Sequence, residues 1–342
     1  MAKAHLAPSR ADWLAQVREE ALDPDLPICD AHHHLWDHGP EDRYLVPELL
    51  ADIGSGHKVV STLYVDCFSA YRRSGPEELK PVGETVWVES LAGSLPPHSA
   101  TRIAAGIVGT ANLMLGARVG EVLDAHIEAS PRFRGIRHWL NWDADTDAMG
   151  LRSDAAPRLA FEPAFREGYR ELGKRNLGFD AWMYFPQLPD LAALARAIPE
   201  VPIVLNHAGG LLGLGPYAQR DEAFALWYRN MQELSTCPNV SVKLGGLGVP
   251  RCGFGWHQRD TPPGSADLAS AFSPYILESI ELFGTDRCLF ESNFPADKCA
   301  YDYTVFWNAC KRMARCCSPA ERAALFHDNA VRLYRLPPEP LT

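Results

Sequence analysis

The chain has 342 residues, of which 46% are apolar and 22% are charged, so it can bury a large core without disulfide or metal support. Its formal net charge of -10 and its isoelectric point near 5.6 exclude long-range attraction to nucleic acid or to an anionic membrane surface. We therefore expect a small molecule as its partner, and neither a nucleic acid nor a membrane.

The N-terminal stretch and the cysteines bear on cellular location. The first residues, "MAKAHLAPSRADWLAQVREEA", lack the apolar run of a secretory signal peptide, and nowhere do about eighteen apolar residues follow one another. The nine cysteines are scattered and form no C-x-x-C pair, which indicates free thiols. We expect a cytoplasmic protein.

Residues 9–27 begin with a helical pattern and end in prolines, which predicts an N-terminal helix that leads into the first strand. Eight short runs rich in β-branched and apolar residues follow along the chain. Several are apolar on both faces, as in a parallel sheet that helices cover on both sides. The predicted strands are residues 27–34, 59–66, 102–109, 133–140, 179–184, 201–206, 239–244 and 288–292.

Segments with helical periodicity lie between these strands, at residues 44–53, 117–129, 164–175, 188–198, 221–235 and 268–284. The alternation predicts an α/β fold, a (β/α)8 TIM barrel over about residues 25–335 within a single domain of residues 1–342. No G-x-G-x-x-G follows the first strand to favour a dinucleotide fold. Two further helices, 303–316 and 318–336, are expected after the barrel, the second with a capping box that begins at Ser318.

The stretch "ICDAHHHLWD" places three consecutive histidines at the end of the first predicted strand. Because successive strand residues face opposite sides, His32 and His34 share one face and His33 takes the other. Barrel enzymes carry catalytic groups at the carboxyl ends of their strands, and two imidazoles there can supply adjacent metal ligands. Taken alone, the pair is explained slightly better by hydrogen bonding at a polar strand end. His33 is expected to be a packed residue.

Two further strand ends carry polar groups that belong at the same rim. His207 ends the sixth predicted strand in "VLNHAGG", and the two glycines after it allow close approach. The eighth strand ends in "LFESNFPADK", where Glu291 and Asn293 share a face. The carboxylate of Glu291 can bind a metal or act as a general base. Because parallel strand ends converge on one barrel mouth, these groups are expected to meet the first-strand histidines.

These motifs together resemble the amidohydrolase superfamily, and in particular amidohydrolase family 2. They are D-x-H-x-H on the first strand, a histidine ending the sixth, and a polar motif before Phe-Pro on the eighth. The chain looks most like the branch of metal-dependent TIM-barrel hydrolases that includes 2-pyrone-4,6-dicarboxylate lactonase and sugar-lactone hydrolases. The resemblance implies that His32, His34 and His207 bind the metal, and Glu291 stays a further candidate ligand because of its place at the end of the eighth strand. It also implies that Arg137 in "FRGIRHWL" binds an acidic group of the substrate.

Two departures from this family affect the metal. Asn293 stands where the family has an aspartate, and an amide cannot take up a proton and is a weaker metal ligand. Either Glu291 has become the base, or the chemistry differs from ordinary metal-assisted hydrolysis. Residues 177–189, around the fifth strand, hold neither lysine nor histidine, which argues against a binuclear site bridged by a carboxylated lysine. We expect one divalent metal, zinc before manganese, while a metal-free enzyme stays open because the resembled pyrone lactonase requires none.

Four other side chains are candidates for contact with the substrate. Lys243, at the end of the seventh strand, is expected to hold a carboxylate or stabilise negative charge, with a solvated rim lysine as the alternative. Trp182 and Tyr184 share a face of the fifth strand and could form the wall of a substrate site, although such aromatic spacing is common in a plain core. His257 follows the seventh strand in a loop that can equally be a packed lid. Asp66 is expected to orient a ligand histidine.

These expectations favour a hydrolase of a small cyclic ester, in which a metal, or Arg137 and Lys243, polarises the carbonyl. Water is activated near Glu291 or Asn293, and His207 is the third catalytic candidate. A non-oxidative decarboxylase or hydratase of the same superfamily is the second hypothesis, and a catalytically silent barrel that only binds its ligand is the third. The substrate is expected to be acidic and the assembly a homodimer.

Overall fold

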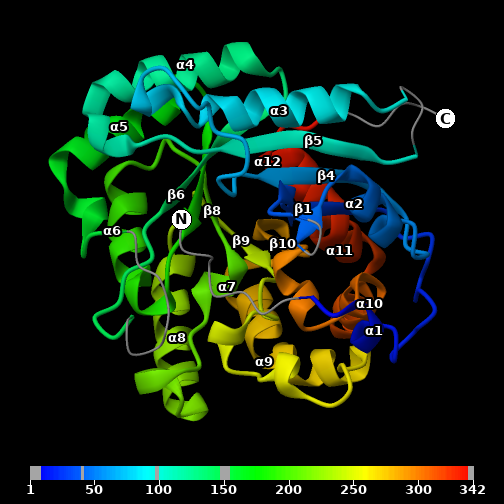
Figure 1. Cartoon of the computed structure of the whole chain (residues 1–342). Coiled ribbons are helices and arrows are strands. Elements are labelled where there is room, and N and C mark those ends of the chain that lie inside the picture. The colour runs from blue at the N-terminus through cyan, green and yellow to red at the C-terminus, as the bar shows by residue number, and fades with distance from the viewer. Residues whose placement is uncertain (1–8, 40–41, 97–99, 147–154, 338–342) are drawn as a thin grey trace.

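The computed structural model describes residues 9–39, 42–96, 100–146 and 155–337. Its centre is a parallel sheet of eight strands that pair in chain order, nearly closed into a barrel with helices on the outside (Figure 1). The eight strands are β1 (Ile28–His33), β4 (Val59–Val65), β5 (Arg102–Gly109), β6 (Phe133–Trp139), β7 (Gly178–Trp182), β8 (Ile203–Leu205), β9 (Val240–Leu244) and β10 (Cys288–Phe290). Each coincides with one of the predicted runs, so the predicted (β/α)8 architecture is confirmed.

Helices connect the strands in the expected alternation. After β1, two antiparallel strands of two residues each form a separate small sheet. These two strands are β2 (Trp36–Asp37) and β3 (Arg43–Tyr44). The helices are α1 (Ala11–Leu14), α2 (Val46–Ile53), α3 (Val82–Gly93), α4 (Val119–Ala129), α5 (Pro163–Lys174), α6 (Leu188–Ala197), α7 (His207–Gly210), α8 (Arg220–Ser235), α9 (Ser265–Phe283), α10 (Tyr303–Met313), α11 (Pro319–Ala323) and α12 (Asn329–Leu333). Within the described ranges, none of these helices combines the length and the apolarity that a membrane span requires.

The barrel closes through the segment that follows β10 rather than through β10 itself. The backbone nitrogen of Asn293 donates to the carbonyl oxygen of His32 at 2.9 Å, and that of His34 donates to Phe294 at 2.8 Å. His33 and Phe294 form the accompanying parallel bridge. This seam holds the end of the first strand and the residues after the last strand in a fixed register.

The N-terminal helix is much shorter than the sequence predicts. Only Ala11–Leu14 is helical, and the rest of the segment runs as irregular backbone over the C-terminal helices. Asn308 explains the difference, because its amide nitrogen donates to Glu19 and its amide oxygen accepts from the backbone nitrogen of Leu22. Lys311 donates to the next two carbonyl groups of the segment. These tertiary hydrogen bonds satisfy backbone groups that a helix would otherwise pair internally.

Helix α3 does not appear among the predicted helices. Its sequence, "VGETVWVESLAG", holds two glycines and several β-branched residues, which are poor helix formers. Packing favours the helix instead, because Val82 and Val88 are fully buried. Gly83 is required here, since a Cβ would lie 2.7 Å from the backbone oxygen of Ala70.

The C-terminal segment packs against the inner side of the barrel. Ser318 forms the predicted capping box with Glu321 at the start of α11. After α12, Tyr334 and Leu336 join a core cluster with inward-facing residues of β1, β4, β5, β8 and β10. The hydroxyl of Tyr334 reaches the buried carboxylate of Asp180 in β7, at 2.9 and 3.0 Å from its two oxygens. The chain end therefore supplies a polar contact inside the barrel.

We expect Tyr334→Phe to lower the free energy of unfolding by about 1–3 kcal/mol, because a buried carboxylate loses a hydroxyl donor. Urea-induced unfolding measures the change. Tyr169→Phe is the matched control, since the buried Tyr169 hydroxyl has no hydrogen-bond partner within the described residues. Equal unfolding free energies for the two variants would mean that the Asp180 contact contributes nothing.

Candidate active site

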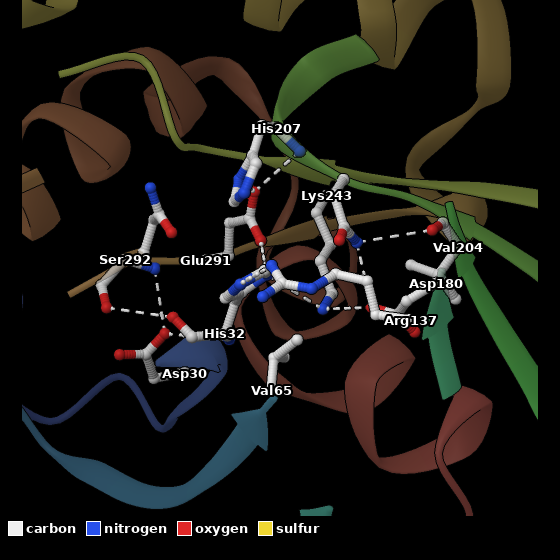
Figure 2. A network of polar contacts seen from close by, with 12 residues as sticks. Asp30, His32, Val65, Arg137, Asp180, Val204, His207, Lys243, Glu291 and Ser292 are labelled. Carbon is white, nitrogen blue, oxygen red and sulfur yellow. Dashed lines mark hydrogen bonds and ion pairs between the residues drawn. The ribbon is translucent and has the colours of Figure 1, made fainter. Parts of the chain in front are cut away.

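Four predicted site residues meet at the carboxyl ends of three barrel strands, and Figure 2 shows His32, His207 and Glu291 among them. His32 belongs to β1 and His34 follows it, His207 comes two residues after β8, and Glu291 directly follows β10. Their side chains are nearly or fully buried, with at most 5% of any residue exposed. The barrel thus gathers groups that lie more than 250 residues apart in sequence into one enclosed cluster.

The two outer histidines of the triplet face each other, as the strand periodicity predicts. Nε2 of His32 lies 3.2 Å from Nε2 of His34. Nδ1 of His34 contacts the carbonyl oxygen of Val65 at 2.7 Å, and since a carbonyl only accepts, this nitrogen carries the proton. His33 points elsewhere, with Nε2 at 2.9 Å from the Thr62 hydroxyl. The triplet is therefore one pair and one packed residue.

His207 and Glu291 form a close pair that depends on an unusual backbone turn. His207 and Ala208 have left-handed φ values of 57° and 48°. This turn directs both the backbone nitrogen and the ring of His207 at Oε1 of Glu291, at 3.0 Å for the backbone and 2.7 Å for Nδ1. Gly246 makes room for the ring, because a Cβ there would lie 2.2 Å from Nδ1.

The second oxygen of Glu291 faces His32. Oε2 lies 2.8 Å from Nδ1 of His32, but the alignment is too bent for a regular hydrogen bond, and no other donor of the described residues reaches this oxygen. A buried carboxylate oxygen without a regular donor is costly. Such an oxygen is expected where a bound cation, or a donor that turns toward it, supplies the missing contact.

Burial sets the protonation of the cluster. It lowers the pKa of His32, His34 and His207 well below the ordinary histidine value, so all three rings are neutral near neutral pH. Neutral imidazole is the form that binds metal ions. Burial also raises the pKa of Glu291 to about 8, although Lys243 and the backbone of His207 oppose this rise. A divalent cation next to the carboxyl group would favour its ionised form.

The structure rules out the alternative that the sequence left open for Lys243, a solvated rim lysine. It is fully buried, its Nζ donates to Asp180 at 2.7 Å, and it lies 3.3 Å from Nδ1 of His32. It is therefore not a solvated rim residue. Asp180 also accepts from Asn206 at 2.9 Å and was missed as a site residue. An aspartate in the middle of an apolar strand, as in "FDAW", was the available signal, because such a group needs a buried partner.

Arg137 reaches into the cluster from β6. Its Nη1 lies 3.3 Å from Nε2 of His32, Nη2 donates to the backbone oxygen of Asp66, and Nε has no partner among the described residues. The Asp66 carboxylate does not orient a ligand histidine, as the sequence suggested, because it accepts from the hydroxyl of Tyr71. The backbone oxygen of Val65 orients His34 instead.

Asn293 does not share the face of Glu291. Strand β10 ends at Phe290, so the alternation assumed for the two residues no longer applies, and Asn293 has a left-handed φ of 56°. Its amide nitrogen donates to Asp297 at 2.7 Å. Asp297 is buried and also accepts from the backbone of Gly248 at 2.8 Å.

Of the three remaining candidates, Trp182 contacts the cluster and Tyr184 contacts Trp182. The ring of Trp182 packs edge-on against His207 with centroids 4.9 Å apart, and Tyr184 packs against Trp182 at 5.9 Å. Arg251 lies over the Trp182 ring at 4.5 Å, with two buried guanidinium nitrogens that have no partner among the described residues. No hydrogen bond, ion pair or ring contact joins His257 to the cluster in the described part of the chain, and its carbonyl oxygen accepts from Arg10.

The arrangement fits one divalent metal ion. His32, His207 and Glu291 can each offer a ligand atom within 4.8 Å of the others, and no other such group of at least three occurs among the described residues. His34 adds a fourth candidate beside His32. Nε2 of His207 makes no hydrogen bond to the residues that the structure describes, so its lone pair is available. Nitrogen-rich sites of this kind suit zinc and related transition metals.

Comparison with known proteins agrees with this geometry. Residues 29–336 match the model of a family described as amidohydrolase. An uncharacterized protein, y4mH, of Sinorhizobium fredii is 33% identical over 91% of this chain and 99% of its own length. The L-fucono-1,5-lactonase of Burkholderia ambifaria is 30% identical over 90% of this chain and 95% of its own length.

A solved structure also resembles the chain closely. It is an amidohydrolase from Burkholderia multivorans with bound zinc, with a TM-score of 0.70 and 25% identity over 91% of this chain and 99% of that one. The family match covers almost the whole barrel, including every residue of the cluster. The chain therefore belongs to the amidohydrolase family.

Proposed function

We propose that the protein is a metal-dependent lactonase that hydrolyses small cyclic esters of the sugar-lactone type. The relatives named L-fucono-1,5-lactonase, at 30% and 27% identity over 90% of the chain, support this substrate class. The observation that carries the proposal is the enclosed cluster of three neutral histidines and one carboxylate at the strand ends. The cluster lies at the carboxyl ends of the strands, which is the end of the barrel where enzymes of this fold carry out their chemistry.

The histidines His32, His34 and His207 would hold the metal, and zinc is the first choice because it is bound in the similar structure from Burkholderia multivorans. We place Glu291, which the sequence offered as a further ligand, behind the histidines instead, because its two oxygens lie 2.7 and 2.8 Å from the Nδ1 atoms of His207 and His32. A bound divalent metal would polarise a carbonyl group and lower the pKa of water.

The cations around the cluster suit a substrate with an acidic or strongly polar group. Arg137 keeps a buried Nε without a partner among the described residues, and Arg251 keeps two such nitrogens. Guanidinium groups bind carboxylates well because they offer several donors in one plane. Trp182, between Arg251 and His207, would form an apolar wall beside these donors. Lys243 contributes positive charge next to His32 while its Nζ stays on Asp180.

In the proposed reaction, water adds to the lactone carbonyl carbon, the bond to the ring oxygen breaks, and that oxygen leaves as a hydroxyl group. The product is a hydroxy acid. Of the three residues predicted as catalytic, Glu291 is the one suited to take up the proton of water. Asn293 has an amide, which cannot do so. Nδ1 of His207 is already engaged by Glu291.

His34→Asn tests the metal site. We expect wild-type protein purified without chelator or added metal to contain about one equivalent of zinc, and the variant less than about a tenth, because one proposed ligand is lost. Elemental analysis measures both. His138→Asn is the matched control, because His138 also lies near a strand end but packs against Phe165. Wild-type protein with less than about a tenth of an equivalent of any divalent metal would contradict the proposed site.

Substrate class is tested with a panel of sugar 1,5-lactones and a pyrone dicarboxylate. Lactone hydrolysis releases a carboxylic acid, so a pH indicator follows it, and carbon dioxide release from aromatic acids is measured in parallel. We expect turnover of at least one sugar lactone by the zinc-loaded wild type and by His138→Asn, and none by His34→Asn. Carbon dioxide release without lactone turnover would instead favour a decarboxylase.

A further inference from the structure

We infer that Glu291 is the positioning residue of the metal site, which holds His32 and His207 by their Nδ1 atoms so that both present Nε2 to the metal. The inference rests on the proposed metal site and concerns a role beyond any proton that Glu291 accepts. It assigns the carboxylate to the layer of groups behind the ligands, where metal-binding histidines usually find a partner for their second nitrogen.

The contact with His207 is the firmest part of the argument. Oε1 of Glu291 accepts from the backbone nitrogen of His207 at 3.0 Å and lies 2.7 Å from its Nδ1. Two contacts from one residue fix both the position and the rotation of the imidazole ring. A neutral ring that donates through Nδ1 keeps its lone pair on Nε2.

The contact with His32 is nearly as short as the first one but is not aligned as a hydrogen bond. Oε2 lies 2.8 Å from Nδ1 of His32, and a modest turn of the carboxylate plane would align this pair, because the terminal torsion of a glutamate is soft. On the other side of the ring, Nη1 of Arg137 lies 3.3 Å from Nε2. A guanidinium group only donates, so this contact also requires the lone pair of His32 on Nε2. Nζ of Lys243 lies at the same distance, 3.3 Å, from Nδ1 of His32 and, with two N–H groups left after its bond to Asp180, would favour the opposite tautomer. The 2.8 Å approach of Oε2 of Glu291 decides between the two, because a carboxylate oxygen this close to Nδ1 needs an N–H there and not a second lone pair.

Distances separate the two kinds of contact in the cluster. Two ligand atoms on one tetrahedral zinc lie about 3.3 Å apart, because zinc–nitrogen and zinc–oxygen bonds are about 2.0–2.1 Å long. The Nε2 atoms of His32 and His34 are 3.2 Å apart, close to that value. The contacts between Glu291 and the two Nδ1 atoms, at 2.7 and 2.8 Å, have hydrogen-bond length instead.

The chain makes space for this carboxylate at two neighbouring glycines. A Cβ at Gly245 would lie 2.1 Å from the backbone oxygen of Glu291 and 2.6 Å from its Cγ. A Cβ at Gly246 would lie 2.2 Å from Nδ1 of His207. Glycine at both positions therefore leaves the space that Glu291 and His207 occupy.

Glu291→Gln tests the inference with zinc alone as the probe. The amide can accept from one Nδ1–H, but its NH2 group faces the other ring with a second donor, so one histidine loses its partner. We expect the zinc dissociation constant, measured by competition with a chromophoric chelator, to rise about 10–100-fold. Glu171→Gln is the control, because it makes the same change at a nearly buried carboxylate on α5 that pairs with Lys174 and Arg175, and we expect unchanged zinc affinity.

The outcomes distinguish this inference from the proposed function. A Glu291→Gln variant that binds zinc within about threefold of the wild type would overturn the inference and leave Glu291 as a base only. Wild-type protein that binds no zinc would overturn the proposed metal site together with the inference. Neither result depends on turnover.

A second measurement needs only the wild type, in case the variant fails to fold. Long-range proton–nitrogen NMR spectra of zinc-loaded protein with 15N-labelled histidine report which ring nitrogen carries the proton. We expect His32 and His207, assigned by single substitutions, to carry it on Nδ1. A proton on Nε2 of either ring would mean that the metal binds Nδ1, and the inference would be wrong.

Discussion

The seam between the end of β1 and the residues after β10 is the constraint on which the site depends. Its backbone bonds, from Asn293 to His32 and from His34 to Phe294, join the two chain segments that carry the first histidines and Glu291. Without this register, the histidines at the end of β1 and Glu291 after β10 would not be held close together. The fold thus positions the cluster through main-chain groups, which do not vary with the side chains they carry. This leaves the side chains of the rim free to determine the chemistry.

Charge balance is the second constraint, because nearly every group of the cluster is buried. Asp180 offsets the ammonium group of Lys243, and Tyr334 and Asn206 complete the hydrogen bonds of that carboxylate. Breaking one partner of such a pair costs about 3–5 kcal/mol, since it leaves a charge uncompensated. The C-terminal segment therefore contributes to the site through Tyr334, although it lies outside the strand and helix repeats. Among the residues that the structure describes, Glu291 differs from Asp180 because its close partners are two ring nitrogens and one backbone nitrogen.

Much of the fold could be predicted from sequence, because buried parallel strands are short apolar runs and the eight runs alternate with helical segments. The alternation of side chains along a strand also distinguished His32 and His34 from His33, because this alternation depends only on backbone geometry. What failed depended on tertiary contacts. Asn308 and Lys311 replace most of the N-terminal helix with hydrogen bonds of their own. The pairing of Glu291 with Asn293 failed because β10 ends at Phe290. No local pattern reveals either effect.

Glu291, and not Asn293, supplies the carboxylate that lies against the histidines of the cluster. Asn293 cannot supply negative charge, and its amide nitrogen is committed to Asp297. Glu291 stands two residues earlier, directly after the last strand. Its carboxylate lies between the rings of His32 and His207. A carboxylate in that place needs the room left by Gly245 and Gly246. The acid after β10 therefore depends on the glycine pair after β9, because a Cβ at Gly245 would overlap Glu291 and a Cβ at Gly246 would overlap His207.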